Sequence, residues 1–118
     1  MRKRTLVVSG LAVGLLLVAT ACFYVENMHP VALFTADQVT GNSPLDVNFD
    51  ASDSYDLDGS IVQYAWDFND GQTASATIAT MGHQFTVQSE SKVFRVVLTV
   101  TDDAGANDQA VKDITVSP

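Results

Sequence analysis

The most regular pattern in this chain is the alternation of apolar and polar residues in short runs after residue 30. Along residues 93–101, Phe94, Val96, Leu98 and Val100 occupy every second position. A period of two residues is typical of a strand with one buried face. No stretch after residue 25 shows a period of 3.6 residues. The pattern therefore predicts strands and no helix in this part of the chain.

A second alternating run covers residues 61–68 and contains the only tryptophan. Val62, Tyr64, Trp66 and Phe68 are expected on one side of this strand. We interpret Trp66 as a packed core aromatic rather than a surface on which a ligand stacks. The expected structural core is built around Trp66, Tyr64, Phe68 and Leu98.

Glycine, asparagine, aspartate and serine interrupt the chain often enough to divide it into seven predicted strands. These are residues 31–36, 45–50, 61–68, 73–79, 83–88, 93–101 and 108–116. Asp70-Gly71 and Asp103-Ala104-Gly105 predict tight turns, and Gln88 to Lys92 predicts a hairpin loop. Short strands at this spacing predict an all-β, antiparallel β-sandwich.

The N-terminus has the composition of an export signal. Arg2, Lys3 and Arg4 precede the apolar stretch 6–19, and small residues then lead to Cys22, the only cysteine. A single cysteine excludes an internal disulfide.

Three interpretations of this segment remain open. Ala19-Thr20-Ala21-Cys22 resembles a bacterial lipobox, in which residues 1–21 are a signal peptide and Cys22 is lipidated. An ordinary secretory cleavage before Cys22 is the second interpretation, and an uncleaved membrane anchor over 5–25 is the third. The first and third both place the rest of the chain outside the cytoplasm and attached to a membrane.

The charge changes markedly when the leader is set aside. Residues 22–118 carry three basic residues against 14 acidic ones, a formal net charge of −11. Such a surface repels phosphate backbones, so nucleic acid is excluded as an expected partner.

Residues 49–71 match a known signature. Phe49-Asp50-Ala51-Ser52, Asp58-Gly59 and Tyr64-x-Trp66-Asp67-Phe68-x-Asp70-Gly71 resemble the hallmark of the polycystic kidney disease (PKD) domain. Val96-x-Leu98-Thr99-Val100-Thr101-Asp102 is similar to its second signature, and Pro30-Val31-Ala32-x-Phe34 fits its start. The chain departs from the family at Asn69, where glycine is usual, and in the longer connection between His83-Gln84-Phe85 and Phe94.

The resemblance implies an immunoglobulin-like β-sandwich over residues 30–118, preceded by a linker at 22–29. It also implies an extracytoplasmic interaction or spacer module rather than an enzyme. No nucleophile elbow, HExxH motif or phosphate-binding loop occurs in the sequence. We expect a membrane-anchored module that contacts protein or polysaccharide in the cell envelope, at the outer membrane if the source has one. The alternative is a structural spacer without a ligand.

No cofactor is required by these expectations, and calcium is the one metal considered. Asp56 and Asp58 lie two residues apart before Gly59, and Ca²⁺ prefers several oxygen ligands. Some PKD domains bind Ca²⁺ where this loop meets the end of a later strand, which implies Asp56, Asp58 and Asp102 as ligands and Asn27 as a weaker one. The competing interpretation is that Asp53, Asp56 and Asp58 only cap turns through hydrogen bonds to the backbone.

Overall fold

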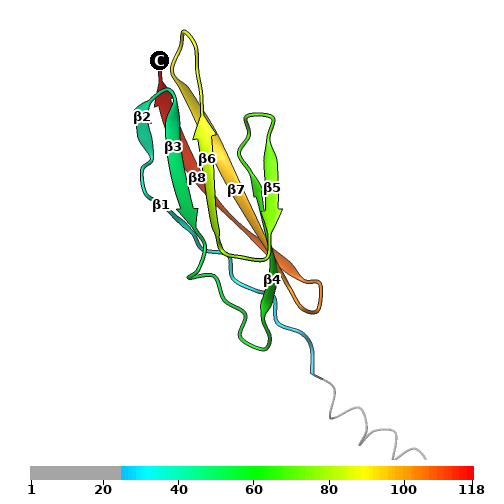
Figure 1. Ribbon diagram of the computed structural model, residues 1–118. Coiled ribbons are helices and arrows are strands. Elements are labelled where there is room, and N and C mark those ends of the chain that lie inside the picture. Colours follow the sequence, from blue (N-terminus) through cyan, green and yellow to red (C-terminus); the bar gives the residue numbers. More distant parts are fainter. Residues whose placement is uncertain (1–24) are drawn as a thin grey trace, which may run out of the picture.

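The computed structural model describes residues 25–118 (Figure 1). Cys22 and the predicted signal segment 1–21 lie outside the described residues. Within residues 25–118, no helix is long and apolar enough to cross a bilayer. The described part is built from strands and loops, as the alternation predicts.

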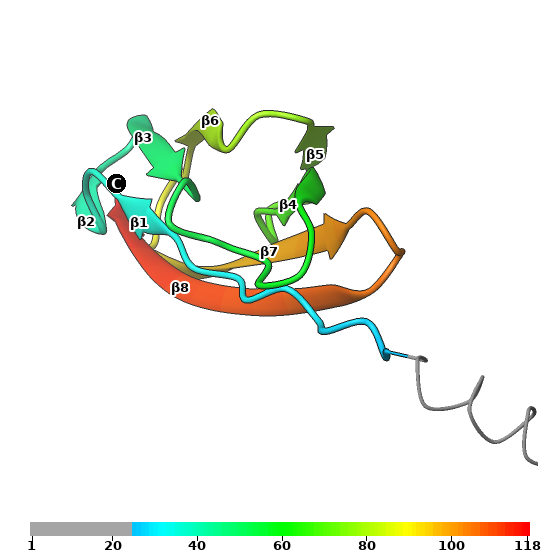
Figure 2. The same cartoon turned by 90° about the horizontal axis from the view of Figure 1, so that it is seen from below.

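Eight strands follow one another along the chain. They are β1 (Thr35–Ala36), β2 (Thr40–Asn42), β3 (Leu45–Asp50), β4 (Ile61–Asp67), β5 (Thr73–Ala76), β6 (Thr80–Phe85), β7 (Lys92–Asp102) and β8 (Asn107–Ser117). They form a three-stranded sheet in the order β1-β3-β6 and a five-stranded sheet in the order β2-β8-β7-β4-β5. Figure 2 shows β3 and β6 on the opposite side of the core from β7 and β8. The predicted β-sandwich is confirmed.

The strand count and one pairing differ from the prediction. Strand β2 was not expected, and it pairs in parallel with β8 while the other neighbouring strands are antiparallel. It has only three residues, Thr-Gly-Asn, a composition typical of turns. So short a strand carries no periodic signal, and its partner lies more than 70 residues later in the chain.

Three predicted strands were misplaced or too long. The strand predicted at 73–79 is regular only at Thr73–Ala76. The sixth strand spans Thr80–Phe85 rather than 83–88, because Met81, His83 and Phe85 are the residues that alternate toward the core. Residues 86–91 instead connect β6 in one sheet to β7 in the other, so the predicted hairpin loop at Gln88 to Lys92 is an inter-sheet connection. The first predicted strand, 31–36, is regular only at Thr35–Ala36, although Val31 forms an isolated bridge with Tyr55.

Aromatic side chains from both sheets fill the space between the layers. Trp66 is 1% exposed and packs against Phe34 and Phe49, at centroid distances of 5.2 and 5.4 Å. Phe68 and Leu98 are also buried, and Tyr64 is partly buried against the same cluster. The alternating residues of β7 all point into this core.

Val62 does not join the buried face to which it was assigned. A bulge between Ile61 and Gln63 interrupts the pairing of β4 with β7. A bulge places an extra residue on one strand and shifts the alternation by one. Val62 is consequently exposed, and Ile61 packs against the core in its place.

The turns have the backbone that their residue types predict. Gly71 and Gly105 have φ values of 92° and 90°, in the region that favours glycine. Asn69 has φ of 55°, which asparagine tolerates better than most residues. The departure from the family pattern at Asn69 thus leaves the turn intact.

Candidate functional site

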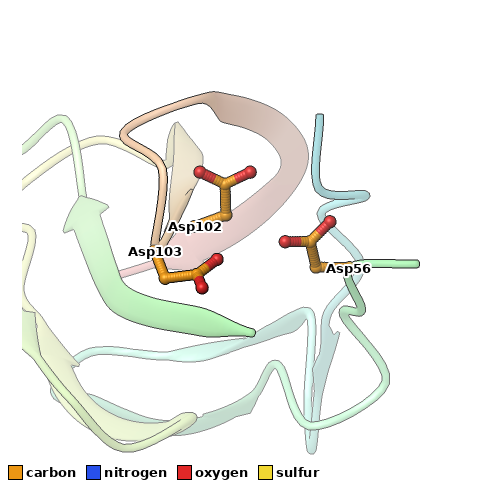
Figure 3. Close-up of side chains that lie close together, drawn as sticks. All are labelled: Asp56, Asp102 and Asp103. Carbon is orange, nitrogen blue, oxygen red and sulfur yellow. The ribbon is translucent and has the colours of Figure 1, made fainter. Parts of the chain in front are cut away.

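Three carboxylates converge at the end of the sandwich where the β3–β4 loop meets the β7–β8 turn. Asp56 comes from the loop, Asp102 ends β7, and Asp103 begins the turn (Figure 3). One oxygen from each lies within 4.8 Å of the others. Residues separated by about 45 positions in the sequence therefore form one cluster.

Asp102 is held by hydrogen bonds within the fold. Its side chain is buried, and one oxygen accepts from the backbone amides of Ala104 and Ala106 at 3.0 and 2.8 Å. Its other oxygen accepts from Asn27 Nδ2 at 2.9 Å. The Asn27 hydrogen bond is the main reason that the pKa of Asp102 lies below its ordinary value, with the backbone amides adding to the shift. Asp102 therefore stays ionised in spite of its burial.

Asp56 has the opposite environment. Both of its carboxylate oxygens are buried, and neither has a hydrogen-bond partner of standard geometry among residues 25–118. Desolvation raises the pKa of Asp56 above its ordinary value, and the neighbouring Asp58 and Asp102 raise it further. The backbone amide of Asp58 lowers the pKa of Asp56, but by less than desolvation and the neighbouring carboxylates raise it, so turn capping satisfies Asp56 only weakly.

Asp58 does not belong to this cluster of three carboxylates and binds the N-terminal segment. One of its oxygens accepts from the backbone amide of Met28 at 2.8 Å. Asn27, one residue earlier, holds Asp102. Two neighbouring residues of the predicted linker thus attach to two of the three predicted metal ligands.

Asp103 is a member of the cluster that the sequence interpretation treated only as a turn residue. Its backbone amide donates to the Ser60 carbonyl at 3.0 Å, which ties the turn to the loop. The signal that could have identified it is its position directly after Asp102, where a second carboxylate follows the end of a strand.

Gly59 allows these carboxylates to approach one another. A Cβ atom at this position would lie 2.4 Å from Asp103 Oδ1 and 3.0 Å from Asp56 Oδ2. Contacts below 3.0 Å require atoms to move, so any larger residue would displace at least the Asp103 carboxylate. The absence of a side chain at Gly59 is part of the geometry of the cluster.

The cluster has dimensions that suit a hard cation. Ca²⁺–oxygen distances of about 2.3–2.6 Å place two ligands of one ion at most about 5 Å apart. The 4.8 Å limit for Asp56, Asp102 and Asp103 meets that condition. An unpartnered, buried carboxylate such as Asp56 is the kind of group that a cation would satisfy.

A second polar pair lies away from the cluster and is structural in character. His83 Nε2 lies 2.6 Å from Asp70 Oδ2, and its ring stacks on Phe68 at 3.7 Å with an interplanar angle of 3°. Asp67 and Asp70 also accept from backbone amides two residues later, at 2.9 and 3.0 Å. These groups join β6 to the β4–β5 turn by local hydrogen bonds.

Comparison with known proteins identifies relatives for most of the described chain. The profile of the PKD domain matches residues 27–116. The pre-pro-metalloprotease PrtV of Vibrio cholerae is 38% identical over 91 residues, which are 77% of this chain and 9% of that protein. Collagenase ColA of Clostridium perfringens is 39% identical over 71 residues, which are 60% of this chain and 6% of the collagenase. The chain spans about a tenth of the length of the curated relatives it matches.

Solved structures agree with this assignment. The PKD1 domain of the Vibrio cholerae metalloprotease PrtV aligns with a TM-score of 0.60 and 33% identity, over 77% of this chain and all of that one. A chain solved in connection with carbohydrate-binding modules of the β-sandwich superfamily aligns with a TM-score of 0.73 and 34% identity, over 79% of this chain and 36% of the other. The family profile begins at residue 27, so it includes the Asn27 and Met28 contacts described above. The chain belongs to the PKD domain family.

Proposed function

We propose that this chain is an extracytoplasmic PKD-type binding module, held at a membrane by its N-terminus, that contacts polysaccharide or protein. The observation that carries the proposal is the similarity of most of the described domain to parts of a metalloprotease, a collagenase and a chain associated with carbohydrate-binding modules. The basic and apolar leader followed by Cys22 supports export and lipid attachment. The domain carries no catalytic role in this proposal.

The outer face of the three-stranded sheet suits a polysaccharide. Asp46, Asn48 and Asp50 alternate with buried residues along β3 and face solvent. Asn48 donates through its backbone and side-chain amides to the two oxygens of Asp37, each at 2.9 Å. Planar polar groups held in fixed orientations are suited to hydrogen-bonding sugar hydroxyls, because little side-chain freedom is lost on binding.

A hollow in this face provides room for a ligand. Its volume is about 470 Å³, and its lining includes Thr35, Asp37, Asn48, Asp50, Thr80 and Gly82. Gly82 leaves space in the middle of β6, where an added Cβ would meet only Asn48 Oδ1 at 3.3 Å. We therefore place the sugar-binding surface here.

The outer face of the five-stranded sheet favours a protein partner instead. Val97 and Val111 are direct neighbours across β7 and β8, and Val93 and Val111 are more than half exposed. Exposed apolar side chains grouped on one surface are a feature of protein contacts. This observation supports the protein half of the proposal.

Calcium is proposed as a structural ligand of the loop end. Asp56, Asp102 and Asp103 would hold the ion, and Asp58 and Asn27 would support them from the next positions. The ion would neutralise carboxylates that otherwise repel one another and would supply the partner that Asp56 lacks. The proposed function does not depend on it.

A glycan array probed with the full chain in detergent tests the leading proposal. Saturable binding to a polysaccharide is expected, with at least a tenfold loss on Gly82→Leu, which fills the hollow. Thr99→Leu, on the outer face of the other sheet, is the matched control and should bind as well as the parent chain. If neither the array nor a pull-down with envelope proteins gives saturable binding, the chain is a structural spacer.

A further inference from the structure

Exposed apolar side chains gather where the described chain begins. Two segments run side by side there, because Val31 and Tyr55 exchange backbone hydrogen bonds of 2.7 and 3.1 Å and Leu33 N donates to Ser54 Oγ at 2.8 Å. Leu57 is 71% exposed, and Met28, Leu33 and Tyr55 are each between 45% and 49% exposed. We call Val31, Leu33, Tyr55 and Leu57 the apolar end patch, and Met28, whose backbone amide donates to Asp58, flanks it.

The burial pattern places these side chains on one surface. Pro30, Ala32 and Phe34 are buried, so Val31 and Leu33 between them point outward. Across the bridge, Tyr55 and Leu57 are exposed and Asp56 between them turns toward the carboxylate cluster. Directly opposed residues of paired segments project from the same face. Val31, Leu33, Tyr55 and Leu57 therefore form a continuous outward surface.

The same end of the domain lies next to the proposed membrane anchor. Figure 1 shows the chain leaving the sandwich beside the loop that carries Tyr55 and Leu57. Met28 follows Cys22 by six residues, which span at most about 20 Å when extended. Hydrogen bonds from Asn27 and Met28 to Asp102 and Asp58 fix the chain against the domain at this point. A lipid attached at Cys22 would hold the apolar end patch within reach of the bilayer surface.

We propose that the apolar end patch docks onto the surface of the bilayer in which the chain is anchored. The docking depends on the proposed anchoring and adds a second contact to it. Leu57, with the largest exposed fraction in the patch, would enter the interface most deeply. Tyr55 suits the same boundary, because its ring is apolar and its hydroxyl is polar.

The acidic residues around the apolar end patch determine which lipid headgroups it can approach. Asp53, Asp56 and Asp58 belong to the same loop. Of the basic residues in the described chain, Lys92 and Arg95 lie on β7, and Lys112 on β8 places its Nζ 5.9 Å from the centre of the Phe34 ring, one residue beyond Leu33. One lysine against three carboxylates leaves this end of the domain acidic. Anionic headgroups would be repelled by these carboxylates. The expected surface is therefore one of neutral, zwitterionic lipid such as phosphatidylcholine.

The test uses the full chain in phosphatidylcholine nanodiscs that contain a small fraction of nitroxide-labelled lipid. Amide signals of Met28, Leu33, Tyr55 and Leu57 should broaden strongly, and those of Val93 and Val111 on the five-stranded sheet should not. The double variant Tyr55→Ser, Leu57→Ser should reduce the broadening at Met28 and Leu33 at least threefold. The exposed Val111→Ser change is the matched control and should leave it unaltered. Replacing a third of the lipid by phosphatidylglycerol, in chelator, should weaken the broadening at least twofold.

Three other outcomes of these experiments would contradict the docking. Flotation of the chain with phosphatidylcholine vesicles, but without broadening at the patch, would show an anchored domain that stands free of the surface. Absence of flotation would overturn the anchoring and the docking together. In an unprocessed chain that retains residues 5–21, contacts from these residues to the patch that persist in lipid-free detergent would show that the chain covers its own patch. Ligand binding on the glycan array is measured separately, so its failure leaves the docking result standing.

Discussion

At the scale of single residues, the carboxylates around Gly59 show how strongly environment changes one side-chain type. Asp102 is buried among donors, and those hydrogen bonds lower its pKa. Asp56 has buried oxygens without donors, and desolvation raises its pKa. The two residues are alike in sequence, yet one is satisfied by the fold and the other is left to be satisfied by a ligand.

Asp56→Asn should raise the melting temperature in chelator at pH 7 and abolish stabilisation by Ca²⁺. A folded-state pKa above the unfolded one means that the folded protein binds the proton more tightly, so this group reduces stability as the pH rises through that range. Removing the charge removes that penalty. For the parent chain, Ca²⁺ at about ten times its Kd should raise the melting temperature on the order of 5–10 °C.

Thermal melts with and without Ca²⁺ measure this effect. Asp53→Asn, an exposed change in the same loop, is the control and should keep the response to calcium. Equal melting of the parent chain in chelator and in calcium would remove the metal proposal.

Gly59→Ala should weaken Ca²⁺ binding roughly tenfold, the scale seen when groups that orient metal ligands are altered. The new Cβ would lie 2.4 Å from Asp103 Oδ1 and would push that carboxylate out of the cluster. Calorimetric titration with Ca²⁺ measures the change, and Gly82→Ala in β6 is the matched glycine control. Unchanged affinity in Gly59→Ala would exclude Asp103 as a ligand.

Trp66→Ala should destabilise the fold by about 3–5 kcal/mol, the usual range for removing a large buried side chain. The indole is 1% exposed and touches Phe34 and Phe49. Urea denaturation measures the loss, and Val111→Ala on an exposed face should change stability by less than about 0.5 kcal/mol. A stable Trp66→Ala variant that had lost its ligand would instead show that the indole contributes to binding.

At the scale of elements, the position of a long strand is set by the alternation in its own sequence. The position of a short strand is set by the strand with which it pairs. Strand β7 was predicted at 93–101 and spans Lys92–Asp102, because its eleven residues carry a full alternation. Strand β2 has three residues and forms only because β8 lies beside it. The bulge in β4 likewise arises from pairing with β7, and it reverses the assignment of Val62.

The β7–β8 hairpin provides a test at this scale. Gly105→Ala should cost about 1–2 kcal/mol, because φ near 90° places a Cβ against the backbone. Gly82→Ala lies at an ordinary φ and should cost less. Chemical denaturation compares the two, and an equal cost at both positions would contradict the assigned turn backbone.

At the scale of the whole molecule, the outer faces of the two sheets and the end beside the N-terminus differ in chemical character. Both outer faces have a hollow, of about 470 Å³ on the three-stranded sheet and about 390 Å³ on the five-stranded sheet, which also carries exposed valines. The end beside the N-terminus combines carboxylates with the apolar end patch. A module anchored at that end would present both outer faces away from the point of attachment. This arrangement fits a binding module better than it fits a catalyst.

Cys22→Ser should block processing of the leader and the incorporation of labelled palmitate. The thiol is the group that the proposed lipid attachment requires, and serine offers no equivalent. Metabolic labelling followed by electrophoresis measures both effects. Undiminished labelling would refute lipidation at Cys22, and a processed but unlabelled parent chain would indicate ordinary secretion.

Much of the fold was predictable from local pattern, and less of the candidate site was. Alternation located the long strands and, apart from Val62 in β4, their buried faces. Glycine with aspartate located both tight turns. Asp56 and Asp102 were named in advance on the basis of the family resemblance. The sequence did not reveal that Asp103 joins the cluster, that Gly59 makes room for it, or that an apolar end patch exists. Each of these depends on which loops meet in the folded domain.

The sequence by itself determined the β-sandwich class, the inward rows of β7 and the glycine turns, because these follow from side-chain period and backbone sterics within a few residues. It also contained the PKD hallmark from Phe49 to Gly71, with Asn69 as the one departure named in that range. Only the tertiary structure decided that Asp103 joins the cluster, that Val62 faces water and that Asn27 and Met28 close the end of the domain. Those contacts join segments 30 to 75 residues apart, and no local pattern encodes them.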